Sequence, residues 1–193
     1  MQPWRIPSLA VEFLAAALLA SYAAPGRAAQ DVQIEAHRQG DSVEITAHAQ
    51  LAAPAELVWQ VLTDYERLPA FIPGLTKSTV RKREGNVVFV DQTGEARFLL
   101  FYFPIDVRYE VTERSPQSVE SRAVGGNLKR MNGRYDLEPG TEPLTVRLRY
   151  HGLIEPDFQL PPLIGVAALR SMAEEQFTAM VAEIERRAAG ARP

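Results

Sequence analysis

The chain has 193 residues, of which 46% are hydrophobic and 23% charged, and its formal net charge is −3 at pH 7. These values are typical of one globular domain with a sizeable core, and they exclude the strongly basic surface with which proteins bind nucleic-acid phosphates. The chain contains no cysteine, which excludes disulfides, thiol nucleophiles and cysteine-bound metals.

The first 28 residues are organised like a secretory signal peptide. A short segment with one positive charge, Arg5, precedes an apolar run at 13–24, and small residues follow. Cleavage after Ala28 is favoured, although cleavage after Ala23 also satisfies the rule for small residues. An uncleaved membrane anchor is the alternative, but the run is shorter than the roughly 20 residues that span a bilayer. We therefore expect an exported protein, periplasmic or secreted, with a single domain at 31–190.

The next part of the chain changes from strand to helix and back to strand. Alternation at 32–36 and 43–49, around a turn at 39–41, predicts a hairpin. Two short helices are expected at 53–62, where Pro54 suits the first turn, and at 64–68, where Asp64 suits an N-cap. Glycine and proline turns then separate the segments of an antiparallel meander. The expected strands are 75–84, 86–99, 104–114, 117–125, 128–138 and 143–152.

The meander is predicted to be apolar on one face only. The side chains expected to point inward on two of its strands are Ile105, Val107, Tyr109, Val111, Leu144, Val146, Leu148 and Tyr150. The C-terminal helix predicted at 161–189 is the one element long enough to cover that face. The apolar stripe of this helix comprises Val166, Leu169, Ala173, Phe177, Met180, Val181, Ile184 and Ala188. Pro161 and Pro162 suit its start, and Gly190 suits its end.

The stretch from Ala53 to Pro69, followed by Phe71-Ile72-Pro73-Gly74, resembles the opening signature of the polyketide cyclase/dehydrase and lipid-transport family. This family is part of the START-like (SRPBCC) superfamily and includes coenzyme Q-binding START-like proteins. Segments 94–98, 129–134 and 155–158 are also similar to parts of it, so the resemblance covers about 43–187. The resemblance implies an α+β helix-grip fold. In that fold a curved antiparallel sheet wraps a long C-terminal helix, two short helices follow the first strands, and a cavity holds a hydrophobic molecule.

Motifs of catalysis are missing from the sequence. It contains no nucleophile elbow, zinc-protease helix, Walker loop or dinucleotide-binding glycine pattern. His37, His48 and His151 lie on separate predicted strands, without partners at metal-binding spacing. We therefore expect no catalytic residue, no metal and no cofactor.

A charge interrupts the apolar stripe of the C-terminal helix at Arg170. A cation at this position reaches solvent, pairs with an acid, or meets the polar head of a ligand. The small side chain of Ala173 leaves room beside it, above the first half of the helix. The helix stripe and the inward strand faces together give the expected ligand-binding residues: Arg170, Ala173, Phe177, Tyr109, Val107, Tyr150 and Leu148.

Two apolar segments, 98–104 and 158–164, are candidates for the mouth of the cavity. The mouth residues expected from them are Phe101, Phe103, Phe158 and Leu160. One interpretation is strand core followed by a loop that docks the helix. The other is a hydrophobic portal that touches a membrane surface while a lipid enters.

Binding or transfer of a hydrophobic small molecule, such as a lipid or isoprenoid quinone, is the favoured function because the inward faces are almost wholly apolar. An enzyme remains the alternative: a cyclase or dehydratase in which Tyr109, Tyr150, Arg170 or a histidine positions a polyketide-like substrate. A third interpretation is an exported module that binds a protein partner.

Overall fold

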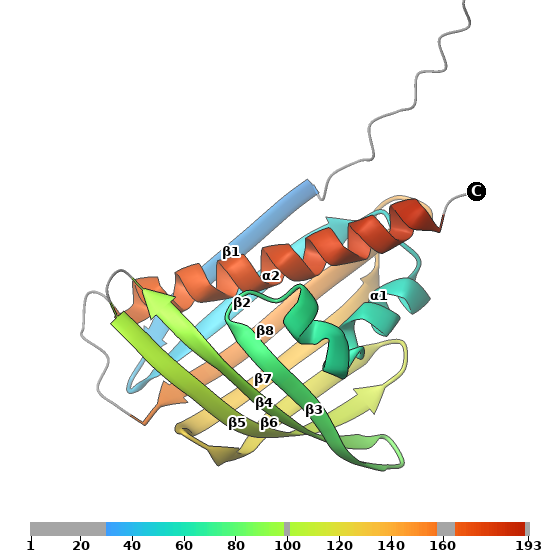
Figure 1. The fold of residues 1–193 in the computed structure, drawn as a ribbon. Helices are drawn as coiled ribbons and strands as arrows, with labels where there is room; N and C mark the ends of the chain where they lie inside the picture. Colours follow the sequence, from blue (N-terminus) through green and yellow to red (C-terminus); the bar gives the residue numbers. More distant parts are fainter. Residues whose placement is uncertain (1–29, 99–100, 158–164, 192–193) are drawn as a thin grey trace, which may run out of the picture.

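The computed structural model describes residues 30–98, 101–157 and 165–191, so the predicted signal peptide lies outside the described part. One antiparallel sheet, two short helices and a long C-terminal helix lying along the sheet make up this part (Figure 1). The elements are β1 (Gln30–Gln39), β2 (Ser42–Leu51), α1 (Ala55–Leu62), the 3-10 helix η1 (Tyr65–Ala70), β3 (Leu75–Glu84), β4 (Val87–Phe98), β5 (Phe101–Arg114), β6 (Ser118–Gly126), β7 (Leu128–Pro139), β8 (Val146–Pro156) and α2 (Gly165–Gly190).

The sheet has eight strands in the order β1-β2-β8-β7-β6-β5-β4-β3. The chain leaves the sheet after β2, passes through α1 and η1, and re-enters at the opposite edge as β3. The six strands from β3 to β8 form a meander that returns to β2. The predicted α+β helix-grip fold, with two short helices after the first strands, is therefore confirmed.

The two halves of α2 differ in burial. From its middle onward, Phe177, Val181 and Ile184 are at most 3% exposed and belong to the main core. In the first half, Val166 and Leu169 are only partly buried. The second half of the helix therefore packs tightly, whereas the first half covers a region that side chains do not fill.

Leu144 is a correction to the predicted strand at 143–152. It is 88% exposed and adopts a φ of 62°, outside any strand, instead of pointing inward. Hydrogen bonds of Thr145 explain the difference, because its hydroxyl donates to the Glu142 carbonyl at 2.7 Å and its own carbonyl accepts from the Gly140 amide at 2.9 Å. These bonds close a turn over 140–145, so β8 starts only at Val146.

Asp64 precedes η1 but makes no N-cap hydrogen bond, contrary to prediction. Its carboxylate instead accepts a hydrogen bond from Arg187 of α2 at 2.9 Å. Arg187 and Arg186 also donate to Glu183, each at 2.7 Å through Nε. Glu183 is only 9% exposed, and this ionic network fastens the end of α2 to the start of η1.

Glu183 is expected to make the stability of the protein sensitive to acid. The hydrogen bonds from Arg186 and then Arg187 lower the pKa of Glu183 from 4.5 to about 2. A lowered folded-state pKa stabilises the protein above pH 4.5, and that stabilisation is lost as the pH falls toward 2. Because Arg186 is largely exposed, the contribution is about 2 kcal/mol. Urea unfolding at several pH values should show a shallower loss in Glu183→Gln than in the wild type, and parallel curves would contradict this role.

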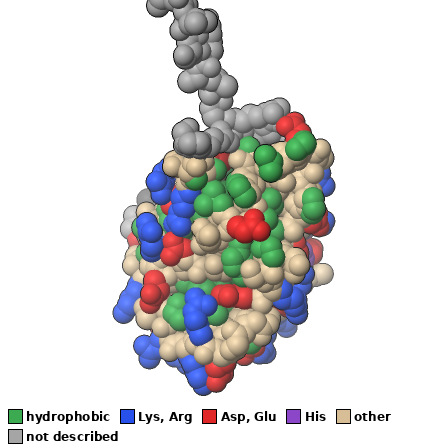
Figure 2. Space-filling view, turned by 90° about the vertical axis from the view of Figure 1, so that its right-hand side faces the viewer, with side chains coloured by type: hydrophobic (Ala, Val, Ile, Leu, Met, Phe, Trp, Pro, Cys, Tyr) green, Lys and Arg blue, Asp and Glu red, His purple; other side chains and the backbone are tan. Residues whose placement is uncertain are grey.

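The surface carries both signs of charge. On the face drawn in Figure 2, basic and acidic side chains are interspersed among apolar and uncharged ones. None of the helices in the described ranges has the length and apolarity that crossing a membrane requires.

Candidate ligand-binding cavity

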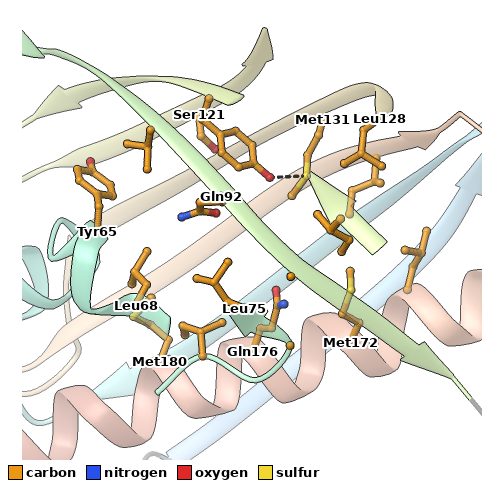
Figure 3. A pocket seen from close by; sticks show the side chains of 18 of the residues that line it. Tyr65, Leu68, Leu75, Gln92, Ser121, Leu128, Met131, Met172, Gln176 and Met180 are labelled. Carbon is orange, nitrogen blue, oxygen red and sulfur yellow. Dashed lines mark hydrogen bonds between the residues drawn. The ribbon is translucent and has the colours of Figure 1, made fainter. Parts of the chain in front are cut away.

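A cavity of about 510 Å³ lies between the meander strands and the first half of α2. This volume is within the range of roughly 300–1,000 Å³ typical of small-molecule sites. The side chains around it are mainly aliphatic or aromatic and come from η1, six strands and α2 (Figure 3). Met131, Met172 and Met180 are among them, and methionine adapts readily to the shape of a bound apolar molecule. The cavity is therefore suited to a hydrophobic ligand.

A row of small residues crosses three strands beneath the cavity. Ser121 of β6 pairs with Gly133 of β7, and Gly133 pairs with Gly152 of β8. Neither glycine adds a side chain, and the Ser121 hydroxyl donates back to the Gly133 carbonyl at 3.2 Å. We call these three residues the small-residue row. The two glycines leave room above the sheet that the Tyr150 side chain occupies.

Two tyrosines flank the small-residue row on one side. Tyr135 and Tyr150 are directly paired across β7 and β8, with ring centroids 4.8 Å apart and planes tilted by 42°. The Tyr150 ring lies along its own strand over Gly152, where an added Cβ would stand only 2.7 Å from the ring carbon Cζ. Glycine at 152 is therefore what allows Tyr150 to lie flat against the sheet.

Tyr109 approaches from the other side, on β5. Its hydroxyl donates to the thioether sulfur of Met131 at 2.8 Å, an interaction visible in Figure 3. Burial raises the pKa of Tyr150 to about 12. Burial first, and then the neighbouring phenols, raise the pKa values of Tyr109 and Tyr135 well above their usual range. All three phenols are thus uncharged at neutral pH and able to donate a hydrogen bond.

Tyr65 of η1 closes the opposite part of the cavity but directs its hydroxyl elsewhere. The hydroxyl donates to Glu113 at 2.9 Å, and Glu113 also pairs with Arg83. Burial and then Glu113 raise the pKa of Tyr65. Its hydroxyl is therefore occupied by the protein.

Two glutamines also face the cavity, as Figure 3 shows. The Gln92 amide donates to Ser78 at 3.2 Å, and the Gln176 amide donates to the Pro73 carbonyl at 3.3 Å. These bonds use the nitrogen of each amide. Most of the other lining residues in the described ranges are aliphatic or aromatic.

The exposed residues among those lining one end of the cavity are Pro104, Asn127 and Asp157. Asn127 joins this end to β5, because its amide donates to the Pro104 carbonyl at 2.6 Å and its oxygen accepts from the Asp106 amide at 3.0 Å. Pairing between β6 and β7 reaches only from Ser118 to Arg122 on the β6 side. Beyond that point the two strands separate, and this end of the cavity opens to solvent.

Of the predicted ligand-binding and mouth residues, Tyr109, Tyr150 and Phe103 line the cavity. Val107, Leu148 and Phe177 are instead buried in the core at 0–3% exposure and are not among the lining residues. The register explains the position of Leu148. This residue lies one inward position beyond Tyr150 and faces the packed half of the sheet.

Arg170 and Ala173 also lie away from the cavity lining. Ala173 is partly buried against the core. Arg170 is exposed, and its Nε donates to the backbone carbonyl of Ile34 in β1 at 3.3 Å. The edge strand β1 runs beside this part of α2 and offers the guanidinium a polar partner near solvent. The Arg170 side chain therefore reaches solvent, the first of the three alternatives considered for it, and does not point into the described cavity.

Phe158 and Leu160 lie outside the described residues, as does the side chain of Phe101. Their predicted place at the mouth stays a prediction.

Sequence reasoning missed Tyr135, Ser121, Gly133 and Gly152. A signal for Tyr135 was present, since Met131, Gly133, Tyr135 and Leu137 alternate with mostly polar residues in β7. The small-residue row had no such signal, because its members are adjacent only through the register of the sheet.

The described lining of the cavity offers apolar side chains, hydrogen-bonding groups and, at its exposed end, the carboxylate of Asp157. The described lining includes no lysine, arginine or histidine. His37 and His151 are exposed and lie near Glu35 and Glu44, and His48 is exposed as well. Within the described ranges no three side chains are grouped as a metal site would require.

The curved sheet packs one face against the long C-terminal helix, and a mainly apolar cavity lies between them. This arrangement defines a helix-grip protein with a cavity of small-molecule size. The chain belongs to the family described as polyketide cyclase / dehydrase and lipid transport, which matches residues 51–181. The resemblance seen in the sequence is thus confirmed. A comparison with curated proteins gives no significant match.

Solved structures share the fold. The STAR-related lipid transfer protein from Xanthomonas axonopodis is 16% identical, with a TM-score of 0.66 over 83% of this chain and 99% of that one. Zhui aromatase/cyclase from Streptomyces sp. R1128 is 17% identical, with a TM-score of 0.64 over 77% and 98% of the two chains. A START superfamily protein from Mycobacterium smegmatis is 14% identical, with a TM-score of 0.61 over 77% and 99%. At these identities the likeness shows the fold alone.

Proposed function

We propose that this protein is exported and binds and carries a hydrophobic small molecule, a lipid or an isoprenoid quinone. The observation that carries the proposal is the cavity of about 510 Å³ with its mainly apolar lining. Transfer of apolar surface from water into such a cavity favours binding by about 25 cal/mol per Å², before the costs of association. No covalent step is required.

A cyclase or dehydratase is the second candidate, and the family supports it. Such a reaction needs a group that takes up a proton inside the cavity. The raised pKa values of Tyr109, Tyr135 and Tyr150 keep these phenols protonated, so they donate but do not act as bases at neutral pH. Asp157 is the one carboxylate in the described lining, and it lies at the exposed end. These features favour carriage over catalysis.

The apolar run at 13–24 supports export, and the opening beside Phe103 supports loading of the ligand from a membrane surface. Co-sedimentation of the purified protein with phospholipid vesicles tests the membrane contact. Recovery of all the protein in the supernatant would argue against it.

The proposal is tested by expressing the full chain in a Gram-negative host and purifying it from the periplasmic fraction. Intact-mass measurement should give a chain that begins at Ala29. Mass spectrometry of an organic extract should identify a reproducible lipid or quinone, and the variant Gly152→Ala, purified in parallel, should yield less of it. A full-length chain retained in the cytoplasm would contradict export. An extract equal to that of a protein-free column would contradict carriage.

A further inference from the structure

Tyr109, Tyr135 and Tyr150 gather around the small-residue row inside a cavity whose lining is mainly apolar. We propose that these three phenols form a subsite that hydrogen-bonds a carbonyl oxygen of an uncharged hydrophobic ligand. The inference rests on the proposed function, because it concerns which class of ligand the same cavity accepts.

The first argument is that the donors are free to serve a ligand. Within the described part of the chain, the hydroxyls of Tyr135 and Tyr150 make no hydrogen bond to protein atoms, although both side chains line the cavity. The Tyr109 hydroxyl bonds only to the Met131 sulfur, which is a weak acceptor that an oxygen atom readily replaces. Hydrogen-bond donors in an apolar cavity gain from an acceptor supplied by the ligand. Tyr65 differs, since Glu113 already accepts its hydrogen bond.

The second argument is spatial. The Tyr150 hydroxyl projects over the small-residue row, because a Cβ added to Gly133 would lie only 3.1 Å from it. The Tyr150 ring and hydroxyl fill the space above Gly133 and Gly152, and the Ser121 hydroxyl donates to the Gly133 carbonyl. The free volume is the cavity itself, which all three phenols line. An oxygen atom fits beside the donors there, while the apolar body of the ligand extends toward Leu75 and Met172 (Figure 3).

The third argument is electrostatic. No cationic side chain occurs in the described lining, and the one acid, Asp157, lies at the open end. A carboxylate or phosphate drawn into the cavity would lose its hydration without gaining an opposite charge, which is costly. Phenols that burial keeps protonated can instead donate hydrogen bonds to an uncharged acceptor oxygen. A ketone or quinone oxygen therefore suits this site better than the head of a fatty acid.

Three rigid ring systems of similar size test apolar contact, hydrogen bonding to a carbonyl and the effect of a negative charge separately. They are anthracene, 9,10-anthraquinone and anthracene-2-carboxylate. Each is titrated against a bound fluorescent dye, N-phenyl-1-naphthylamine, on the full chain after extraction of any lipid. The wild type should bind anthraquinone about tenfold more tightly than anthracene, as one net hydrogen bond provides, and should bind the carboxylate most weakly.

In the triple variant Tyr109→Phe/Tyr135→Phe/Tyr150→Phe, the preference for anthraquinone over anthracene should disappear while the affinity for anthracene stays the same. Tyr102→Phe changes an exposed tyrosine outside the described lining and should keep the preference. The ratio of the two affinities separates a donor role from a structural one, because a damaged cavity would weaken both ligands. Equal affinities in the wild type, a preserved preference in the triple variant, or tightest binding of the carboxylate would each overturn the subsite alone. If neither the dye nor any ring system binds, the proposed function fails and the subsite with it.

Discussion

Replacing Ile184 with alanine should lower the free energy of unfolding by about 3–4 kcal/mol, the range expected for a buried isoleucine whose removal leaves a cavity. Ile184 is 0% exposed in the half of α2 that packs against the core. A domain of this kind has only about 5–15 kcal/mol of total stability. The variant should therefore unfold at clearly lower urea concentration with an unchanged m-value.

Leu169→Ala is the matched control on the same helix. Leu169 is partly buried and lines the cavity, so it lacks packing partners on one side already. Its truncation should cost only about 1 kcal/mol, since fewer contacts are lost, but it should weaken binding of a hydrophobic ligand. Equal losses of stability in the two variants would show that the first half of α2 is packed as tightly as the second, which would contradict an open cavity beneath it.

Leu169 and Ile184 together show which features of α2 the helical periodicity of the sequence could predict. Spacing alone places Leu169 and Ile184 on one apolar stripe, and both do face the sheet. Periodicity gives the direction of a side chain but not the distance to what it meets. That distance depends on the opposite wall, and Leu169 lines the cavity, whereas Ile184 is fully buried in the core.

Other differences have equally local causes. Arg170 was predicted to be a ligand-binding residue, but it is exposed, lies outside the described cavity lining, and donates to a backbone carbonyl of the edge strand β1. The position of β1 beside α2 is set by the order of the whole sheet, which local patterns do not specify. Tyr109 and Tyr150, by contrast, were predicted to line the cavity because strand alternation is strict where one face is buried and the other solvated.

Gly133 and Gly152 illustrate the limit of sequence reasoning most directly. In the sequence each is a glycine that weakens a predicted strand. Only the pairing of β7 with β8 places them opposite each other and beneath Tyr150. Their role depends on the tertiary register, and no spacing rule connects them.

Gly152→Ala should therefore reduce the affinity for a hydrophobic carbonyl ligand on the order of a hundredfold, through a lost hydrogen bond and an occupied cavity. The added Cβ would overlap the Tyr150 hydroxyl and stand 2.7 Å from Cζ and 2.9 Å from Cε1, so the ring must leave the sheet. The space available to the displaced ring is the cavity itself. Stability should consequently change by only about 1 kcal/mol, at the low end of overpacking costs. Dye displacement by anthraquinone and urea unfolding measure the two effects separately.

Graded controls test whether the Tyr150 ring is the cause. An alanine at position 133 would meet Ser121 and Tyr150 at 3.1 Å, which small shifts relieve, so Gly133→Ala should weaken binding less. Gly190→Ala meets no atom within 4 Å and should bind as the wild type does. In the Tyr150→Ala background, Gly152→Ala should have almost no further effect, because no ring remains to be displaced. Full additivity of the two substitutions would show that Gly152 acts on the ligand by another route, and a lack of any binding loss in Gly152→Ala would place the ligand away from the small-residue row.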